Sequence, residues 1–468
     1  MPHPLFTPEI RLLLQEQSPA GLREFCESLH PATMAEALDD DFTPEQVWEV
    51  ISHAGIRTQA AIFEYLPPTR QVEMLEKARP QVGQLLGKMS HDDRVDLHRR
   101  LPQDVAERLL RLVDEADRKD IATLVSYGEN TVGAKMTTDY AWLPGTLSAA
   151  EAIDQLRQQA PDRETIYYIY VLDEAARRAD GSLAPRRLLG VVSLRDLILA
   201  PRHALIRDLM ESEVITVKFD EDREALTRVF TRYDLIAVPV VDDHYGLLGI
   251  VTHDDVLDVV QQEATEDLQR QAGVGPIEGS YLDAKFSRVW ISRVQWLAVL
   301  FLLQMFTINA MSSFESELER VAFLTVFIPL CLSVGGNSGS QAATLVIRAL
   351  ALEQIRLRDW FLVLRRELLM AAALAVFLGV LSIVRTYFLT PDSVLEKVPP
   401  GGFWHLNWTV TFSVMGICLT GATIGAMLPL LIKRIGFDPA LMSAPFIATL
   451  SDVLGIVIFF SVVQAFFF

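Results

Sequence analysis

Five long apolar segments in the C-terminal part of the chain place the strongest constraint on its fold. Each has about 20 residues or more, which is the length that a helix needs to cross the hydrocarbon core of a bilayer. They cover residues 289–311, 322–347, 360–388, 408–432 and 442–468. Trp and Tyr residues near their ends, such as Trp290 and Trp408, are typical of the membrane interface. The sequence therefore predicts a helical membrane domain with five spans over residues 286–468.

Basic residues lie unevenly in the short loops between these spans. They gather before the first span, between the second and third, and between the fourth and fifth: Lys285, Arg288, Arg293, Arg348, Arg356, Arg358, Arg365, Arg366, Lys433 and Arg434. Loops rich in Lys and Arg stay on the cytosolic side. We therefore expect a protein of the cytoplasmic membrane with its N-terminus in the cytosol and its C-terminus outside. Residues 1–17 lack a basic stretch followed by an apolar core, so no signal peptide is predicted.

One carboxylate, Asp452, lies inside the last apolar segment, which contains no Lys or Arg. A charged side chain at the centre of a bilayer costs roughly 2.5–3.5 kcal/mol even on lenient scales, so it usually faces a polar pathway. Asp452 is our candidate for a cation site in the membrane. The alternative is a carboxylate that caps a helix or pairs between helices.

The second span combines Pro329 with Gly335 and Gly336, so we expect a discontinuous helix there. Irregular backbone at membrane depth is tolerated where it is buried in protein or lines a water-filled cavity. The polar side chains that we expect to line such a path are Asn337, Ser338, Gln341 and, on the fifth span, Thr449. Alternatively, the small residues form a helix-packing seam.

The charge of the chain is concentrated before the membrane domain. The net charge is −18, yet from Tyr281 onward there are 13 basic against 11 acidic residues, so the acidic excess belongs to residues 1–280. No basic patch is available for phosphates, which argues against nucleic acid as a partner. The acidity suits divalent cations, or it serves solubility alone. The three cysteines are far apart and predict neither a disulfide nor a zinc site.

Residues 1–130 have the pattern of short amphipathic helices, and we expect an all-α superhelical domain. Thr43 and Ser90 are candidate N-caps. Asp92, Asp93 and Asp96 fall on one face of a helix, because positions three and four apart are neighbours. They form either part of a metal site or an ordinary solvated face.

Residues 131–260 contain two β-rich units, about 59 residues apart. Residues 166–171 and 188–193 form one, and residues 237–241 and 247–252 form the other. Both resemble CBS (cystathionine-β-synthase) modules, which implies an α/β tandem regulatory pair that binds adenine nucleotides such as ATP. The pairs that match the nucleotide-contacting positions of that family are Ser193 with Asp196 and Thr252 with Asp255. Alternatively, Ser193 and Thr252 are helix N-caps only.

The order of these parts resembles the MgtE family of magnesium channels and transporters over essentially the whole chain. The most specific segments are PLCLSVGGNSGSQAATLVIRAL at 329–350, FDPALMSAPFIATLSDVLG at 437–455 and GIVTHDDVLDVVQQEATED at 249–267. The resemblance implies a homodimer with the pore between two membrane domains, where Asp452 holds a largely hydrated Mg²⁺.

The same resemblance implies regulatory Mg²⁺ sites among the soluble parts. An acidic connecting helix over residues 261–285 would link them to the first span. The carboxylates implied as Mg²⁺ ligands are Asp255, Asp258, Glu263 and Glu266, with Asp92, Asp93 and Asp96 as partners from the helical domain. Abundant cytosolic Mg²⁺ would bridge these groups and close the pore.

Two other functional classes fit the residues. One is a proton- or sodium-coupled carrier of divalent cations that uses Asp452 as a protonatable group, because broken spans near the midplane are common in transporters. The other is a membrane sensor without transport. The sequence has no Ser-His-Asp set, Walker loop or HExxH motif, so we do not expect an enzyme. Oxygen ligands suit several hard cations and do not separate Mg²⁺ from Mn²⁺ or Co²⁺.

Overall fold

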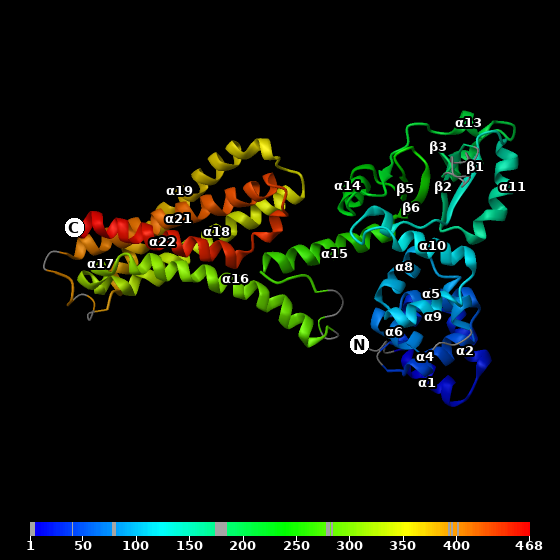
Figure 1. Ribbon diagram of the computed structural model, residues 1–468, viewed down its shortest axis with the longest axis horizontal. Coiled ribbons are helices and arrows are strands. Elements are labelled where there is room, and N and C mark those ends of the chain that lie inside the picture. The colour runs from blue at the N-terminus through cyan, green and yellow to red at the C-terminus, as the bar shows by residue number, and fades with distance from the viewer. Residues whose placement is uncertain are drawn as a thin grey trace. The chain divides into compact units, whose positions relative to one another are not determined.

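The computed structural model describes residues 5–39, 41–76, 81–173, 185–277, 281, 284–391, 394, 396–399 and 402–468. The chain divides into two compact units, Met1–Gln262 and Glu263–Phe468. The first unit contains a helical part and two β-rich modules, and the second contains long apolar helices (Figure 1).

In its described residues the first unit begins with ten helices, as the amphipathic pattern predicts. They are α1 (Thr7–Gln15), α2 (Pro19–Ser28), α3 (Pro31–Leu38), α4 (Pro44–Ser52), α5 (Ile56–Glu64), α6 (Pro68–Glu76), α7 (Gln81–Leu86), α8 (His91–Arg100), α9 (Gln103–Leu110) and α10 (Glu115–Val125). Proline occupies the first turn of α1 to α4, where a missing N–H costs nothing. The Thr43 side chain accepts from the Gln46 backbone in a capping box at α4, so this predicted cap is confirmed.

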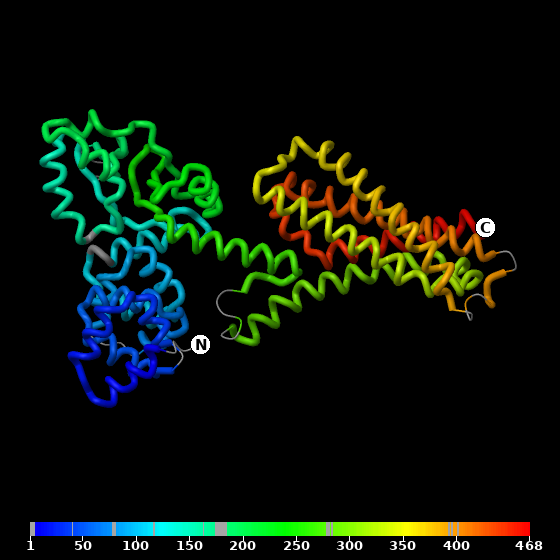
Figure 2. The backbone as a smooth tube through the Cα atoms, turned by 180° about the vertical axis from the view of Figure 1, so that it is seen from behind, coloured from blue at the N-terminus to red at the C-terminus, as the bar shows by residue number. Residues whose placement is uncertain are grey.

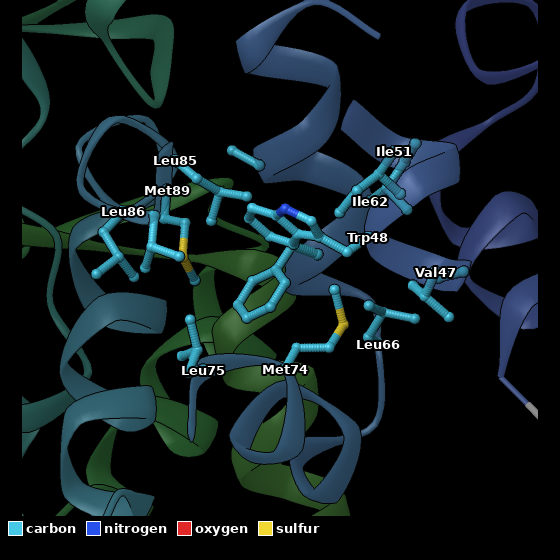
Figure 3. Close-up of a cluster of buried hydrophobic side chains, with 14 of the residues drawn as sticks. Val47, Trp48, Ile51, Ile62, Leu66, Met74, Leu75, Leu85, Leu86 and Met89 are labelled. Carbon is cyan, nitrogen blue, oxygen red and sulfur yellow. The ribbon is translucent and has the colours of Figure 1, made fainter. Parts of the chain in front are cut away.

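A continuous apolar core holds these helices together. Trp48, Leu66, Met74, Leu75 and Met89 all lie in it, with 5% exposure or less (Figure 3). This core fixes the end of α5 and the residues just before α8. It thereby positions the polar residues that follow it in the chain, which become part of the site described below.

Two similar α/β modules complete the first unit. The first consists of β1 (Tyr140–Pro144), α11 (Ala149–Gln159), β2 (Thr165–Leu172), β3 (Leu188–Ser193) and α12 (Leu194–Leu199), and the second of β4 (Val217–Lys218), α14 (Glu224–Tyr233), β5 (Ala237–Val241), β6 (Leu247–Thr252) and the start of α15 (His253–Gln271). Shorter elements are η1 (Val132–Lys135), η2 (Ala160–Asp162) and α13 (Ile206–Leu209). In each sheet the first two strands are parallel and the last two antiparallel. The four predicted strands are confirmed, whereas β1 and β4 were not predicted.

The second unit contains the membrane helices. Among the residues that the structure describes, five helical segments are long and apolar enough to cross a membrane: Phe286–Ser312, Ala322–Ala351, Leu357–Leu389, Phe403–Arg434 and Ala444–Phe467. Their main helices are α16 (Phe286–Ser312), α18 (Ile328–Ala351), α19 (Trp360–Leu389), α21 (Phe403–Arg434) and α22 (Ala444–Phe467), with short elements α17 (Glu315–Arg320), η3 (Ala322–Phe327), η4 (Leu357–Asp359) and η5 (Pro439–Leu441) between them. The long helices lie side by side as a bundle (Figure 2). The five predicted spans are confirmed.

The predicted break in the second span is wrong. Helix α18 continues without interruption from Ile328 to Ala351. Pro329 lies in its first turn, where the backbone N–H has no intrahelical partner to lose. The only irregular part of this span is the 3₁₀ segment η3, which precedes the proline.

The glycines of α18 serve close helix packing. A Cβ atom built on Gly421 of α21 would lie 2.4 Å from the Gly335 carbonyl oxygen, and one on Gly425 would lie 2.0 Å from that of Gly339. The backbones of α18 and α21 therefore approach each other more closely than any side chain permits. This packing fixes one face of α18 in the protein and leaves another face open.

Candidate functional site

Acidic side chains line a cavity of about 210 Å³ in the first unit. The carboxylates come from the end of α5, from α8 and from α15, and they are Glu64, Asp92, Asp93, Asp96, Asp255 and Asp258. Arg100 and Lys135 also line it. The structure therefore brings five of the carboxylates predicted from the sequence together, from segments that are far apart in the chain.

Asp92 and Asp255 are in direct contact through a hydrogen bond between their side chains. Burial raises the pKa of Asp92 well above its usual range, and repulsion from Asp255 adds to this. Burial also raises the pKa of Asp255, to about 6, although bonds from Asp92 and Thr252 oppose the rise. The hydrogen bond raises the pKa of Asp92, which donates, and lowers that of Asp255, which accepts, so a proton between the two carboxyls is held by Asp92.

Glu64 is a member of this cavity that was not predicted. It ends α5 directly after the buried Ile62 and Phe63, and its side chain accepts from the Ser90 backbone N–H at 2.8 Å. Burial raises its pKa to about 8, ahead of repulsion from Asp93 and Asp92. The position of Glu64 directly after the apolar pair Ile62 and Phe63 is the sequence signal that could have indicated its partial burial.

Basic groups neutralise one side of the cavity. The Lys135 ammonium lies 2.8 Å from an Asp96 carboxylate oxygen, and Arg100 lies 3.8 Å from the same oxygen. Ser90 precedes α8, but its hydroxyl donates to Asp93 at 3.0 Å and makes no capping bond, so its predicted side-chain cap is wrong.

The cavity suits a hydrated cation better than a fully dehydrated one. Within the described ranges, no group of three or more His, Cys, Asp or Glu side chains is arranged to ligate a metal directly. Mg²⁺ keeps several of its waters and is usually held by one or two carboxylates. The Asp92–Asp255 pair, once deprotonated, fits this requirement, with Glu64 and Asp258 able to accept from the waters of the ion.

The two hydroxyl–carboxylate pairs assigned to nucleotide binding differ in their surroundings. The Ser193 hydroxyl donates to Asp196 at 2.6 Å and accepts from its backbone N–H at 3.0 Å, so Ser193 caps α12. The Thr252 hydroxyl lies 2.8 Å from Asp255, whose carboxylate also faces the acidic cavity. In the first module Asp196 is exposed, whereas in the second Asp255 also bonds Asp92.

Glu263 and Glu266 belong to the second unit. There the Arg270 guanidinium bridges Glu266 on the same helix and Asp438, which precedes η5. Burial raises the pKa of Asp267, and repulsion from Asp438 and Glu263 adds to this. Arg270 thus joins the end of α15 to the turn between α21 and α22.

Asp452 lies half-buried on α22, where Gln304 of α16 hydrogen-bonds its carboxylate. Helices α18 and α22 are antiparallel: a Cβ on Gly336 would lie 3.2 Å from that of Ala448, and the Ser340 hydroxyl donates to the Ala444 carbonyl at 3.3 Å. The next turn therefore brings Asp452 to the level of Leu332 and Ser333 on α18.

The remaining polar residues of the second span divide between two faces of α18. Asn337 and Gln341 are exposed, and the Asn337 amide donates to the exposed Ser333 at 3.3 Å. Ser338 is buried and donates to the Cys418 carbonyl of α21. On α22, Thr449 is buried and donates to its own helix at Pro445. The positions of Ser338 and Thr449 favour helix packing over a pore lining, whereas Asn337, Gln341 and the unpredicted Ser333 follow one open face.

Comparisons with known proteins agree with the order of a helical part, β-rich modules and membrane helices along the chain. Residues 328–462 match the model of the MgtE divalent cation transporter family, residues 29–130 that of the MgtE intracellular N domain, and residues 206–262 that of the CBS domain. The chain is 37% identical to a magnesium transporter MgtE of Thermus thermophilus over 96% of both chains. It is 30% identical to that of Bacillus subtilis, over 98% of this chain and 96% of the relative. A crystal structure of the soluble part of a magnesium transporter superposes with a TM-score of 0.50 at 30% identity, covering 55% of this chain and 98% of that one.

Proposed function

This chain belongs to the MgtE family of magnesium transporters, and from that premise we propose that it is a Mg²⁺ channel whose path passes Asp452. The matched family model is that of a divalent cation transporter, and the relatives are magnesium transporters. The proposal extends this to the permeation path, the assembly and the gating of this particular chain.

The observation that carries the proposal is the open polar face beside Asp452. Ser333, Asn337 and Gln341 are spaced by four residues on α18, and all three are exposed in a span whose mean hydropathy is 1.4. Polar side chains at membrane depth are rare against lipid and usually face protein or water. A path for a hydrated cation satisfies them and also the charge of Asp452.

A second copy of the chain completes this path. Helix α16 has no fully buried residue, and the polar face of α18 is uncovered in a single chain. A symmetric dimer would cover both and place two Asp452 carboxylates close to its axis. The oligomeric state in detergent, measured by light scattering, tests this part directly.

The acidic cavity supports regulation by cytosolic Mg²⁺. Its carboxylates come from α5 and α8 on one side and from α15 on the other, and α15 continues toward the membrane unit. A bound cation would relieve the repulsion among Glu64, Asp92, Asp255 and Asp258 and hold α15 against the helical part. Glu263 and Glu266 are proposed as further Mg²⁺ ligands on α15. Low Mg²⁺ would then release α15 and open the path.

Flux through the reconstituted chain tests the function. Asp452→Asn keeps the size of the side chain and removes its charge, so Mg²⁺ influx into liposomes should fall to the background level. Glu319→Gln makes the same change from carboxyl to amide at an exposed residue of α17, and this matched control should conduct normally. Normal influx through Asp452→Asn would refute the path.

The alternative of a coupled carrier predicts a different dependence. At a fixed Mg²⁺ gradient, a channel gives the same flux with or without an opposing proton or sodium gradient. A carrier changes its flux with that gradient.

Nucleotide binding at Ser193 and Asp196 stays a prediction, and titration of the chain with ATP tests it.

A further inference from the structure

The contact between α16 and α22 assigns a role to a residue outside the proposed path. We propose that Gln304 is a positioning residue: its side-chain amide orients the Asp452 carboxylate toward the open face. The inference rests on the proposed function of Asp452, which it extends to a second helix.

Two hydrogen bonds set the register between these helices. The Trp296 indole N–H donates to the Ser443 hydroxyl at 3.0 Å, and Gln304 bonds Asp452 farther along. At 1.5 Å per residue, Trp296 and Gln304 are about 12 Å apart along α16. Ser443 and Asp452 are about 13.5 Å apart along α22. The near-equal spacing shows that the helices run parallel in one register, so Gln304 reaches Asp452 without distorting either helix.

The side of α16 that packs on α22 also fixes Gln304. Trp296, Leu300, Leu303 and Thr307 are half-buried and recur every three to four residues, which marks the packed seam. Gln304 lies one helical turn after Leu300 and is exposed at the edge of this seam. Its amide therefore meets Asp452 at the border between packed protein and the open face.

The chemistry of an amide explains why this residue type suits the position. An ionised carboxylate only accepts, so the NH₂ group of Gln304 faces Asp452 and its carbonyl oxygen is left for another donor. A Lys or Arg there would neutralise the charge that attracts the cation. Glutamine orients the carboxylate and leaves its charge intact, and its free carbonyl oxygen can accept from a water of the hydrated ion.

Concentration-dependent Mg²⁺ influx into liposomes tests the assignment in the full chain. Gln304→Met keeps the length and removes the hydrogen bond, and Gln304→Asn keeps the amide on a side chain that is too short. Both should raise the Mg²⁺ concentration for half-maximal influx about tenfold, as expected for a lost bond to a charged group, with little change in maximal influx. Trp296→Phe breaks the other contact between the same helices and should leave the half-saturating concentration unchanged.

The outcomes separate this inference from the proposed function. If Asp452→Asn is inactive while both Gln304 variants keep the wild-type half-saturating concentration, the positioning role is refuted and the path stands. If the Gln304 variants lose only maximal influx, or neither elutes as the wild-type species, Gln304 is structural and the inference fails. If Asp452→Asn conducts normally, the path fails as well.

Discussion

The side chains of Asp92 and Asp255 share a hydrogen bond although both are acidic and they come from helices α8 and α15. Such a pair is stable when one proton lies between the two carboxyls, and it becomes repulsive when that proton is lost. The contact between the helical part and the last β-rich module therefore depends on what neutralises this pair. A proton neutralises the pair, and the Mg²⁺ that we propose for this cavity would compete with that proton.

Mg²⁺ binding at this cavity should release protons. Burial and repulsion from Asp255 raise the pKa of Asp92 and favour its protonated form, and a cation that takes the place of this proton must displace it. Calorimetric titration of the full chain with Mg²⁺ in two buffers of different ionisation enthalpy measures the number released. We expect a clear difference between the buffers for the wild type and a smaller one for Asp92→Asn, which carries no exchangeable carboxyl proton. Equal heats in both buffers for the wild type would contradict this.

The helical part that forms the cavity should become more stable against unfolding as the pH falls. The pKa of Glu64 is about 8 in the folded chain against an ordinary value of 4.5, so the folded state binds a proton that the unfolded state releases between these values. The stabilisation from neutral Glu64 is therefore gained as the pH falls through about 8 and is complete near 4.5. Without Mg²⁺, amide exchange of α8, corrected for intrinsic rates, should slow more than about tenfold between pH 9 and pH 5.

Glu64→Gln tests the source of this pH dependence. The amide still accepts from the Ser90 N–H but does not titrate, so much of the slope should disappear. Glu107→Gln changes an exposed glutamate on α9 and is the matched control. A slope that is unchanged in Glu64→Gln would place the titrating group elsewhere in the cavity.

Local sequence patterns predicted the elements of this chain better than their contacts. Strands β2, β3, β5 and β6 are rich in β-branched and aromatic residues and were found, whereas β4 has only two residues, Val217–Lys218, and offers no alternation to detect. Helix α18 was expected to break because Pro329 and Gly335 were treated as breakers. The proline is harmless in the first turn. The conformational cost of the glycine in a helix is offset by its close contact with α21, which only the folded structure shows.

The candidate site residues also divide into those visible from local sequence and those that depend on contacts. Asp452 was predicted because a lone charge in an apolar segment is visible in the sequence itself. Gln304 and Glu64 were missed, because each becomes significant only through a partner on a distant helix, Asp452 and Ser90 respectively. Exposure separates Asn337 from Ser338 although they are adjacent, since a helix turns neighbouring residues by about 100°.

Close packing of α18 on α21 should not tolerate a side chain at Gly425. A methyl group there would lie 2.0 Å from the Gly339 carbonyl oxygen, so the backbones must separate. We expect Gly425→Ala to destabilise the membrane unit by about 1–3 kcal/mol and to lower its melting temperature in detergent. Gly416→Ala is the milder control, because its methyl group meets only the end of the Ile458 side chain at 3.2 Å. Equal melting temperatures for the two variants would contradict the close approach.

Removal of the Arg270 bridge should loosen the end of α15. Arg270→Gln leaves Glu266 and Asp438 as two carboxylates without their shared cation, and Asp267 lies near both. These groups are partly exposed, so we expect a loss of about 1 kcal/mol, seen as roughly fivefold faster amide exchange at the end of α15. Arg270→Lys should recover only part of this lost stability, because a single ammonium does not reproduce the planar two-sided contact of a guanidinium. Arg434→Gln, at the end of α21, is the charge-matched control and should not change exchange in α15. If Arg270→Gln and Arg434→Gln behave alike, the net charge of this side and not the bridge holds α15 in place.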